Sequence, residues 1–230
     1  MEVGPALPVG PRKRELVRSM FDRIAPRYDR LNRLLTFRLD VGWRRKAVQS
    51  LGSAPGGRVL DVACGTGDLC EDLRAAGHDP VGLDFSAGML AAARTAAPLV
   101  RGDALALPMP DGTFDALTCG FALRNFTALP PVLGECARVL RSGGSLALLD
   151  VAEPANRVAR AGHAFYFRRV VPFVGGLLSD RQAYAYLPAS TSYLPPPSEL
   201  VAMITAAGFH EVRRRPLGAG AAQLLTGRRA

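Results

Sequence analysis

Apolar residues recur with two spacings along the middle of the chain. Continuous apolar runs bounded by turn residues predict buried strands at 58–63, 80–84, 98–102, 114–120 and 145–151. Apolar positions spaced three and four apart predict the intervening helices 68–76, 87–96 and 128–141. Because strands that alternate with helices form parallel sheets covered on both faces, this pattern predicts an α/β fold.

Helical spacing also marks the segment that precedes this core. Apolar positions predict one helix over 13–24 and a second helical pattern that runs through Val48. Gly, Ser and Pro at 52–57 indicate a linker. We therefore expect an N-terminal arm with helices over 1–57 and a core over 58–230, within a single structural domain. The first ten residues, rich in Pro and Gly, are expected to be loose.

The chain changes character after the last of these core strands. Residues 155–178 form a long, partly amphipathic stretch, whereas 184–197 are rich in Tyr and Pro and predict a loop. We therefore expect an insertion over 155–197. The elements predicted after it, which return to the sheet, are a helix over 198–207 and strands near 209–215 and 221–227.

The turn after the first core strand is the strongest candidate for a ligand site. The strand that contains Asp61 leads into a loop with Gly65 and Gly67, and a helical pattern begins at Leu69. This layout lets a backbone come close to a nucleotide-like ligand, because glycine has no Cβ to block the approach. Asp61 can accept hydrogen bonds from the turn or from a cationic ligand. A plain structural turn is the alternative interpretation.

Acidic residues end the next two strands. Asp84 stands 17 positions after Gly67, close to the spacing at which an acid accepts the ribose hydroxyls of a dinucleotide, and Asp103 ends a further apolar stretch. The third glycine of the dinucleotide motif is absent, and no Lys followed by Ser or Thr forms a phosphate-binding loop. These features favour a nucleoside without a pyrophosphate, and S-adenosylmethionine fits that description.

Composition excludes few classes of function. The 230 residues are 48% hydrophobic and carry a formal charge of +9, which suits nucleic acid, an anionic membrane face or plain solubility. The four cysteines form no C-x-x-C pair and predict reduced core thiols, and we expect no metal site. Without a membrane-spanning stretch or a signal-peptide core, a cytoplasmic protein is expected.

Three further motifs carry a family resemblance. They are Phe21-Asp22-x-Ile24-Ala25-x-x-Tyr28-Asp29-x-x-Asn32 with Asp40-x-x-Trp43-Arg44, Gly120-Phe121-Ala122-Leu123-Arg124-Asn125-Phe126-Thr127, and Tyr184-x-Tyr186-Leu187-Pro188-x-Ser190. Together with the glycine loop, they resemble the ubiquinone/menaquinone biosynthesis C-methyltransferases, which are class I S-adenosylmethionine-dependent methyltransferases. The resemblance covers nearly the whole chain from about Val17.

The resemblance implies a Rossmann-like, seven-stranded, mostly parallel sheet with helices on both faces and a lid over 155–197. It assigns Thr66 to the cofactor in the glycine loop, Asp84 to the ribose, and Asp103 with Ala104 to the adenine. The other residues expected to bind the cofactor are Asp61, Gly65, Gly67, Phe85 and Gly120.

Two positions depart from the family pattern. Gly120 stands where the family usually has serine, so one hydroxyl contact is lost there. Ala63 stands where the first glycine of the loop motif is usual, and we expect this change to be mild.

The implied reaction is transfer of a methyl group to a ring carbon of a polyprenylated quinol, with demethylmenaquinol as the preferred substrate. A quinol carbon becomes nucleophilic when the neighbouring phenol loses its proton. The protein therefore has to position the ring and assist the transfer of one proton. We expect Arg124 to stabilise the phenolate, Asn125 to orient a quinol oxygen, and Tyr28 to close over the cofactor. The structural alternatives are an ion pair for Arg124, a turn for Asn125 and helix packing for Tyr28.

Other functions stay open beside this one. They are C-methylation of 2-methoxy-6-polyprenyl-1,4-benzoquinol in ubiquinone biosynthesis, methylation of another small phenol, and non-catalytic binding of S-adenosylmethionine. A nucleic-acid methyltransferase is disfavoured, because residues 121–125 lack the Asn/Asp-Pro-Pro-aromatic motif of base methylation and no nucleic-acid module is visible. The family also suggests a homodimer.

A polyprenyl tail prefers a bilayer to water, so the enzyme is expected to meet its substrate peripherally, at the inner face of the membrane. Arginines among residues 155–178 are placed to attract anionic lipid. Several apolar residues of this stretch are candidates to line a channel for the tail, and packing in the core is their alternative role. They are Phe165, Phe167, Val171, Phe173, Leu177 and Leu178.

Overall fold

A computed structural model describes residues 8–52, 55–178 and 180–230, so the first seven residues of the expected loose N-terminus lie outside the described part. One sheet has the strand order β3-β2-β1-β4-β5-β7-β6, in which β7 runs antiparallel to both of its neighbours. This confirms the expected seven-stranded, mostly parallel sheet. The strands are β1 (Arg58–Val62), β2 (Asp79–Asp84), β3 (Leu99–Arg101), β4 (Phe114–Gly120), β5 (Leu140–Val151), β6 (Phe209–Leu217) and β7 (Ala222–Arg229).

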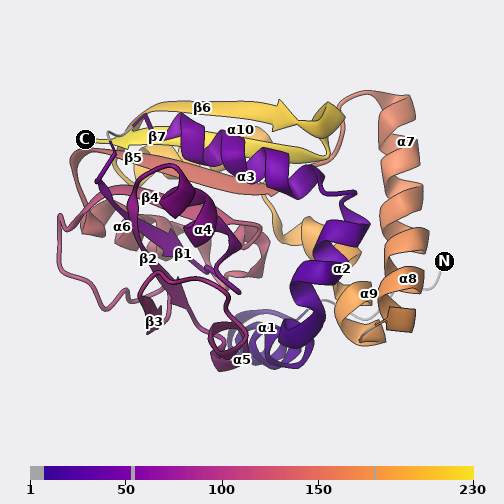
Figure 1. Cartoon of the computed structure of the whole chain (residues 1–230). Helices are drawn as coiled ribbons and strands as arrows, with labels where there is room; N and C mark the ends of the chain where they lie inside the picture. Colours follow the sequence, from indigo (N-terminus) through magenta and orange to yellow (C-terminus); the bar gives the residue numbers. More distant parts are fainter. Residues whose placement is uncertain (1–7, 53–54, 179) are drawn as a thin grey trace.

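Helices cover both faces of the sheet (Figure 1). Successive residues of a strand point to opposite faces, so neighbours in β1 enter different cores. Val59 packs with side chains of α3 and α4, whereas Leu60 packs with side chains of α6 and α10. The helices of the core are α3 (Leu39–Ser50), α4 (Asp68–Ala75), α5 (Ala87–Ala91), α6 (Leu129–Val139) and α10 (Pro197–Ala206).

The N-terminal arm crosses the carboxyl end of the sheet. Helix α1 (Gly10–Ile24) lies beside α5, and a 3₁₀ turn connects it to α2 (Tyr28–Leu35) (Figure 1). Buried Met20 and Ile24 of α1 pack in one cluster with Met89 of α5. The arm therefore packs against the core through α5.

The insertion is helical almost throughout. It contains α7 (Arg157–Phe165), a π-helical turn, α8 (Val171–Leu178) and α9 (Arg181–Ser190). In Figure 1, α7 and α8 form one long upright column beside α2, at the edge away from β3.

The loop predicted over 184–197 is wrong in its first half, where α9 continues to Ser190 with Pro188 inside the helix. Tyr184 and Tyr186 are buried in one cluster with side chains of α1 and α2. Tertiary burial of these rings therefore overrides the local turn signal of Tyr and Pro.

The helix predicted over 87–96 is also wrong in length, because α5 ends at Ala91. The chain turns back there to meet the glycine loop. The N–H of Arg94 donates to the carbonyl of Thr66 at 3.0 Å, and the Thr95 hydroxyl donates to the Glu71 carboxylate at 2.6 Å. Contacts distant in sequence thus end this helix early.

Candidate active site

Three adjoining cavities open at the carboxyl ends of β1, β2 and β4. The central cavity, bordered by α1, encloses about 870 Å³ with its open mouth included. The apolar cavity, bordered by α2 and the insertion, encloses about 1160 Å³, and the glycine-loop cavity encloses about 450 Å³. Tyr28 and Phe121 line all three. Ligands of open α/β sheets bind at this edge, where the strand order reverses.

The structure brings most of the predicted cofactor residues together. The predicted residues that line the central cavity are Gly65, Asp84, Phe85, Asp103, Ala104 and Gly120. Asp61 and Thr66 line the glycine-loop cavity, which shares Gly65 and Gly120 with the central one. Gly67 lines none of the three and instead precedes α4, with a φ of 85°.

The loop after β1 turns on residues in the left-handed region. Ala63 and Gly65 have φ angles of 58° and 57°. Alanine in place of the usual glycine at position 63 is therefore not a mild change for the backbone. An L-residue in the left-handed region carries a cost of about 1–2 kcal/mol. A Cβ built on Gly65 would meet no atom within 4 Å, so open space lies against the backbone at this point.

Asp84 ties the ends of β1 and β2 together. Its Oδ2 accepts a hydrogen bond from the N–H of Gly65 and its Oδ1 accepts one from the N–H of Ser86, each at 2.8 Å. Burial raises the pKa of this carboxyl above its ordinary value, and the backbone N–H groups oppose that shift. The Ser86 hydroxyl caps α5 by accepting from the N–H of Met89.

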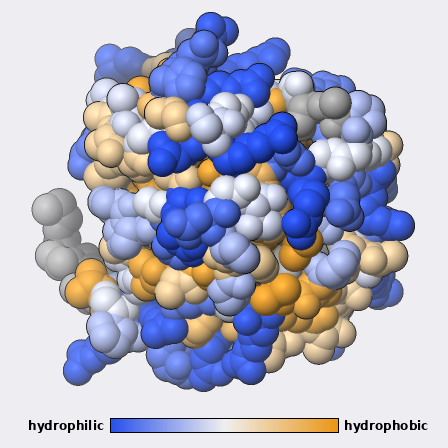
Figure 2. All heavy atoms as spheres, turned by 90° about the vertical axis from the view of Figure 1, so that its left-hand side faces the viewer, coloured by the Kyte–Doolittle hydropathy of each residue, from blue (hydrophilic) through white to orange (hydrophobic). Residues whose placement is uncertain are grey.

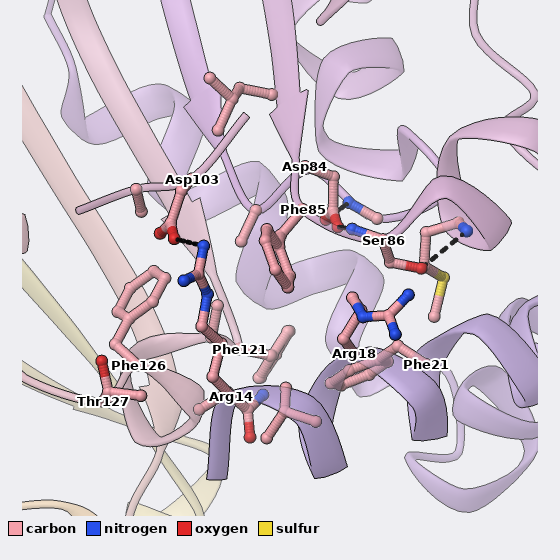
Figure 3. A pocket seen from close by; sticks show the side chains of 18 of the residues that line it. Arg14, Arg18, Phe21, Asp84, Phe85, Ser86, Asp103, Phe121, Phe126 and Thr127 are labelled. Carbon is pink, nitrogen blue, oxygen red and sulfur yellow. Dashed lines mark hydrogen bonds and ion pairs between the residues drawn. The ribbon is translucent and has the colours of Figure 1, made fainter. Parts of the chain in front are cut away.

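A residue of α1 closes over the far side of the central cavity. Arg14 forms an ion pair with Asp103 at 2.5 Å, and its guanidinium carbon lies 4.7 Å from the centre of the Phe85 ring. Figure 3 shows Phe85 between this ion pair and Asp84, with Arg14 and Arg18 rising from α1. Arg14 could not be predicted from local patterns, because α1 reaches the sheet edge only through the tertiary fold.

Asp61 lines the glycine-loop cavity, and among the described residues its carboxylate accepts no hydrogen bond from the turn itself. Its carboxylate accepts hydrogen bonds from Thr118 Oγ1 at 2.8 Å and Cys70 Sγ at 3.6 Å. Burial raises the pKa of Asp61 to about 7. The hydroxyl of Thr66 donates to Asp29 Oδ1 at 2.5 Å, which connects the glycine loop to α2.

Arg124 faces the apolar cavity and is 5% exposed. Its Nη1 pairs with the fully buried carboxylate of Asp150 and donates to the carbonyl of Phe121 at 2.8 Å, while its Nε donates to Ser190 Oγ at 3.2 Å. Within the described residues, Nη2 has no hydrogen-bond partner. The guanidinium is therefore fixed by three groups and keeps donor capacity.

Asn125 lies on the other side, where it lines the central cavity. Its Oδ1 accepts a hydrogen bond from the Tyr186 hydroxyl of α9 at 3.3 Å. Tyr28 stands where the cavities meet, and burial raises its pKa to about 12. The Tyr28 hydroxyl is therefore protonated at neutral pH and has a proton available for a hydrogen bond.

The apolar residues predicted to line a channel divide into two groups. Phe167 and Val171 line the apolar cavity. Phe165, Phe173 and Leu177 lie on the outside of the insertion, exposed by 67%, 73% and 76%. The side chain of Leu178 lies outside the described residues.

Exposed apolar residues that sequence analysis missed surround the turn after α2. Leu34, Phe37 and Leu39 are each more than half exposed, and Phe37 and Leu39 also line the apolar cavity. Phe37 has a φ of 52° and Arg38 a φ of 61°, so two successive non-glycine residues take the left-handed conformation. Such strain clusters at functional sites.

The fold is that of the Rossmann-like methyltransferases. A SAM-dependent methyltransferase from Thermotoga maritima matches with a TM-score of 0.67 at 20% identity, covering 93% of this chain and 100% of that one. Phosphoethanolamine N-methyltransferase 2 of Haemonchus contortus, solved with S-adenosyl-L-methionine, matches with a TM-score of 0.61 at 12% identity, covering 82% of this chain and 52% of that one.

The chain belongs to the ubiE/COQ5 methyltransferase family, whose model matches residues 10–229. It is 44% identical to the demethylmenaquinone methyltransferase of Roseiflexus sp. (strain RS-1), with 96% of each chain covered. It is 48% identical to the enzyme of that name from Thermus thermophilus, covering 91% of this chain and 100% of the relative. The predicted family and the expectation of a methyltransferase are both confirmed.

The described residues contain no group of three or more His, Cys, Asp or Glu side chains that could hold a metal ion. Among their helices, none has the length and hydrophobicity needed to cross a membrane.

Proposed function

We propose that this enzyme transfers a methyl group from S-adenosylmethionine to a ring carbon of a polyprenylated quinol, converting demethylmenaquinol to menaquinol. The observation that carries the proposal is that two cavities of different character meet at Tyr28 and Phe121. In the first, two carboxylates, two arginines and glycine backbone lie among apolar side chains, whereas in the second apolar and aromatic side chains surround Arg124 and His163. The names of the Roseiflexus and Thermus relatives support the choice of a naphthoquinol.

The central and glycine-loop cavities fit S-adenosylmethionine. The open space over Gly65 admits ligand atoms against the backbone, and Asp84 presents a carboxylate to ribose hydroxyls. Phe85 offers a ring face for the adenine, beside Asp103. When bound, S-adenosylmethionine supplies a methyl group activated by the positive charge of its sulfonium.

The smaller cavity suits the amino-acid end of the same ligand. Asp61 and Thr66 line it, and Asp61 favours a cationic neighbour when ionised. Gly120 lines both cavities without a side chain, so the ligand can pass from one to the other there. Gly67 contributes the turn into α4.

The protein's own residues orient the quinol ring and stabilise its charge. A quinol oxygen that has lost its proton is an anion, and the buried guanidinium of Arg124 stabilises an anion in the apolar cavity. The amide N–H₂ of Asn125, which has no hydrogen-bond partner among the described residues, can orient the ring from the central cavity. Tyr28 covers the meeting point and donates a hydrogen bond.

The tail of the quinol leads to the membrane surface. Phe37 and Leu39 connect the apolar cavity to the exterior, and Phe173 and Leu177 extend the exposed apolar surface along α8. A polyprenyl chain gains about 0.8 kcal/mol for each CH₂ group kept in hydrocarbon. We therefore propose that this face, called the apolar rim (Leu34, Phe37, Leu39, Phe165, Phe173 and Leu177), rests on the bilayer.

The direct test is incubation of the pure protein with methyl-labelled S-adenosylmethionine and each of two quinols under anaerobic conditions. We expect one labelled methyl group on a ring carbon of the naphthoquinol, identified by mass spectrometry of the extracted product. Label on the benzoquinol alone would instead assign the enzyme to ubiquinone biosynthesis. Label on neither quinol, with cofactor bound, would refute the proposal.

A further inference from the structure

Within the described residues, a buried histidine nitrogen beside the apolar cavity has no hydrogen-bond partner. His163 of α7 lines this cavity, and its Nε2 is buried without a hydrogen bond within the described residues. A buried polar group without a hydrogen bond is unfavourable, and such groups are rare in folded proteins. A ligand in the cavity is one group that would satisfy it.

The imidazole is held in place rather than loose. Its ring stacks on Phe167 with 4.5 Å between centres and 29° between planes. Burial lowers the pKa of His163, and the nearby Glu153 carboxylate opposes that shift. A neutral imidazole has one ring nitrogen that accepts a hydrogen bond and one that donates.

The donor proposed above accounts for only one of the two oxygens of the ring. Arg124 can only donate, so it suits the quinol oxygen that becomes an anion. A para-quinol carries a second oxygen on the opposite side of its ring, and that hydroxyl has a proton to donate. A hydroxyl buried in an apolar cavity without an acceptor would itself be unsatisfied.

We propose that Nε2 of His163 accepts a hydrogen bond from the ring hydroxyl that Arg124 does not hold. This inference rests on the proposed function, since it names the contact that orients the quinol. His163 is thus a binding residue that selects rings with two oxygens placed across from each other. A ring with one oxygen leaves Nε2 unpaired and binds more weakly.

The test compares three ligands on two proteins. The ligands are a short-tailed dihydroxynaphthalene and its two monomethyl ethers, and the proteins are wild type and His163→Phe. Phe keeps the aromatic stack and the apolar surface but cannot accept a hydrogen bond. We expect His163→Phe to weaken the diol and one ether about tenfold, and to leave the other ether unchanged.

Equal weakening of all three ligands, or of none, would overturn the inference. Affinity for S-adenosylhomocysteine is the control for folding of the variant. A second measurement needs no variant: the nitrogen-15 resonance of one histidine Nε2 in the wild-type protein should move with the diol and with only one ether. Movement with both ethers, or with no ligand, would also contradict it.

The outcome separates this inference from the function on which it rests. If wild type methylates the naphthoquinol but His163→Phe changes the affinity for both ethers equally, His163 is not the acceptor and the reaction stands. If wild type neither binds the diol nor methylates the quinol, both proposals fail.

Discussion

Two helical covers close the site, and they are held in different ways. Helix α1 covers the central cavity through polar contacts: Arg14 pairs with Asp103, and the Lys13 ammonium donates to the carbonyl of Phe126 at 2.7 Å. Within the described residues, the column of α7 and α8 is tied to α2 by a hydrogen bond from the Tyr166 hydroxyl to the carbonyl of Leu35 at 2.7 Å, and Val171 of α8 packs in an apolar cluster with Leu31 of α2. Its outer side carries exposed Phe and Leu side chains.

The difference corresponds to the two ligands that we propose. A charged, water-soluble cofactor reaches a cavity with a polar cover, and a lipid reaches a cavity whose cover presents apolar side chains. In Figure 2, which views the molecule from the left-hand side of Figure 1, away from α7 and α8, hydrophilic side chains dominate and apolar ones lie between them. Variants on the two sides should therefore have separable effects.

The largest effect is expected from Arg124 on the quinol side. Arg124→Lys should lower kcat about a hundredfold or more, since loss of a donor to a developing anion costs a factor of this size. Lys keeps a positive charge near Asp150, so the buried carboxylate is not left without a counter-ion. Affinity for S-adenosylhomocysteine, measured by calorimetry, should stay unchanged. A variant of normal turnover would remove Arg124 from the mechanism.

On the cofactor side, Asp84→Ala should weaken S-adenosylmethionine binding by about ten- to a hundredfold, because a hydrogen bond to a charged group contributes about 1.5–3 kcal/mol. Asp84→Asn is the matched control, since the amide oxygen can still accept from one backbone N–H. Calorimetry should give it an intermediate affinity. Equal affinity in all three proteins would refute the ribose assignment.

The apolar rim should govern membrane binding without affecting the cofactor. The double variant Phe37→Ser and Phe173→Ser should lower partition onto anionic vesicles by about thirtyfold or more, because each ring loses about 1 kcal/mol or more of apolar burial. Replacing both residues with Leu should retain most of the binding. Flotation at low salt measures the effect. If the wild-type protein stays in solution, the membrane proposal fails.

A smaller effect is expected from Asp61 and pH. Because burial raises its pKa to about 7, ionisation of Asp61 around neutral pH should favour a cationic ligand in the glycine-loop cavity. From about pH 6 to about pH 8, cofactor affinity should rise by about three- to tenfold more in wild type than in Asp61→Asn. Parallel pH profiles of the two proteins would exclude a contact between this carboxylate and the ligand.

The same pKa sets the sign of a stability effect. A carboxyl whose pKa is raised on folding binds more protons in the folded state, so its contribution to stability falls as pH rises from about 4 to about 7. Thermal unfolding of the ligand-free protein should show this loss, and Asp61→Asn should reduce it. A loss of equal size in both proteins would assign the pH dependence to other groups.

The smallest effect concerns the polar cover itself. Arg14→Ala should raise the dissociation rate of the cofactor by at most about fivefold, because partly exposed ion pairs contribute about 0.2–1 kcal/mol. Stopped-flow displacement would measure the rate, and Arg12→Ala on the same helix is the control. A rate that is unchanged would mean that α1 does not limit cofactor release.

The strand ends could be predicted from the sequence, and their partners could not. Asp84 and Asp103 follow apolar runs, and a parallel sheet brings the ends of such strands to one edge. Arg14 and His163 reach the same site from helices far along the chain, through packing that no local pattern encodes. Asp150 is the last residue but one of the predicted strand 145–151, so it could have been predicted to lie at this edge of the sheet.

Local patterns also failed where tertiary contacts decide the backbone. The Tyr and Pro residues before Ser190 resemble a loop, yet burial of Tyr184 and Tyr186 stabilises a helix. Ala63 looked like a mild exchange, yet it takes the left-handed conformation that glycine favours. In both cases, the surroundings outweigh the local preference.

The central claim is that cofactor and quinol occupy separate cavities and meet beside Tyr28 and Phe121. A crystal structure with S-adenosylhomocysteine and a short-tailed quinol analogue tests it most directly. We expect the sulfur in the central or the glycine-loop cavity and the ring in the apolar cavity, so that the two face each other between Tyr28 and Phe121. Both ligands in one cavity, or a ring bound away from Arg124, would contradict it.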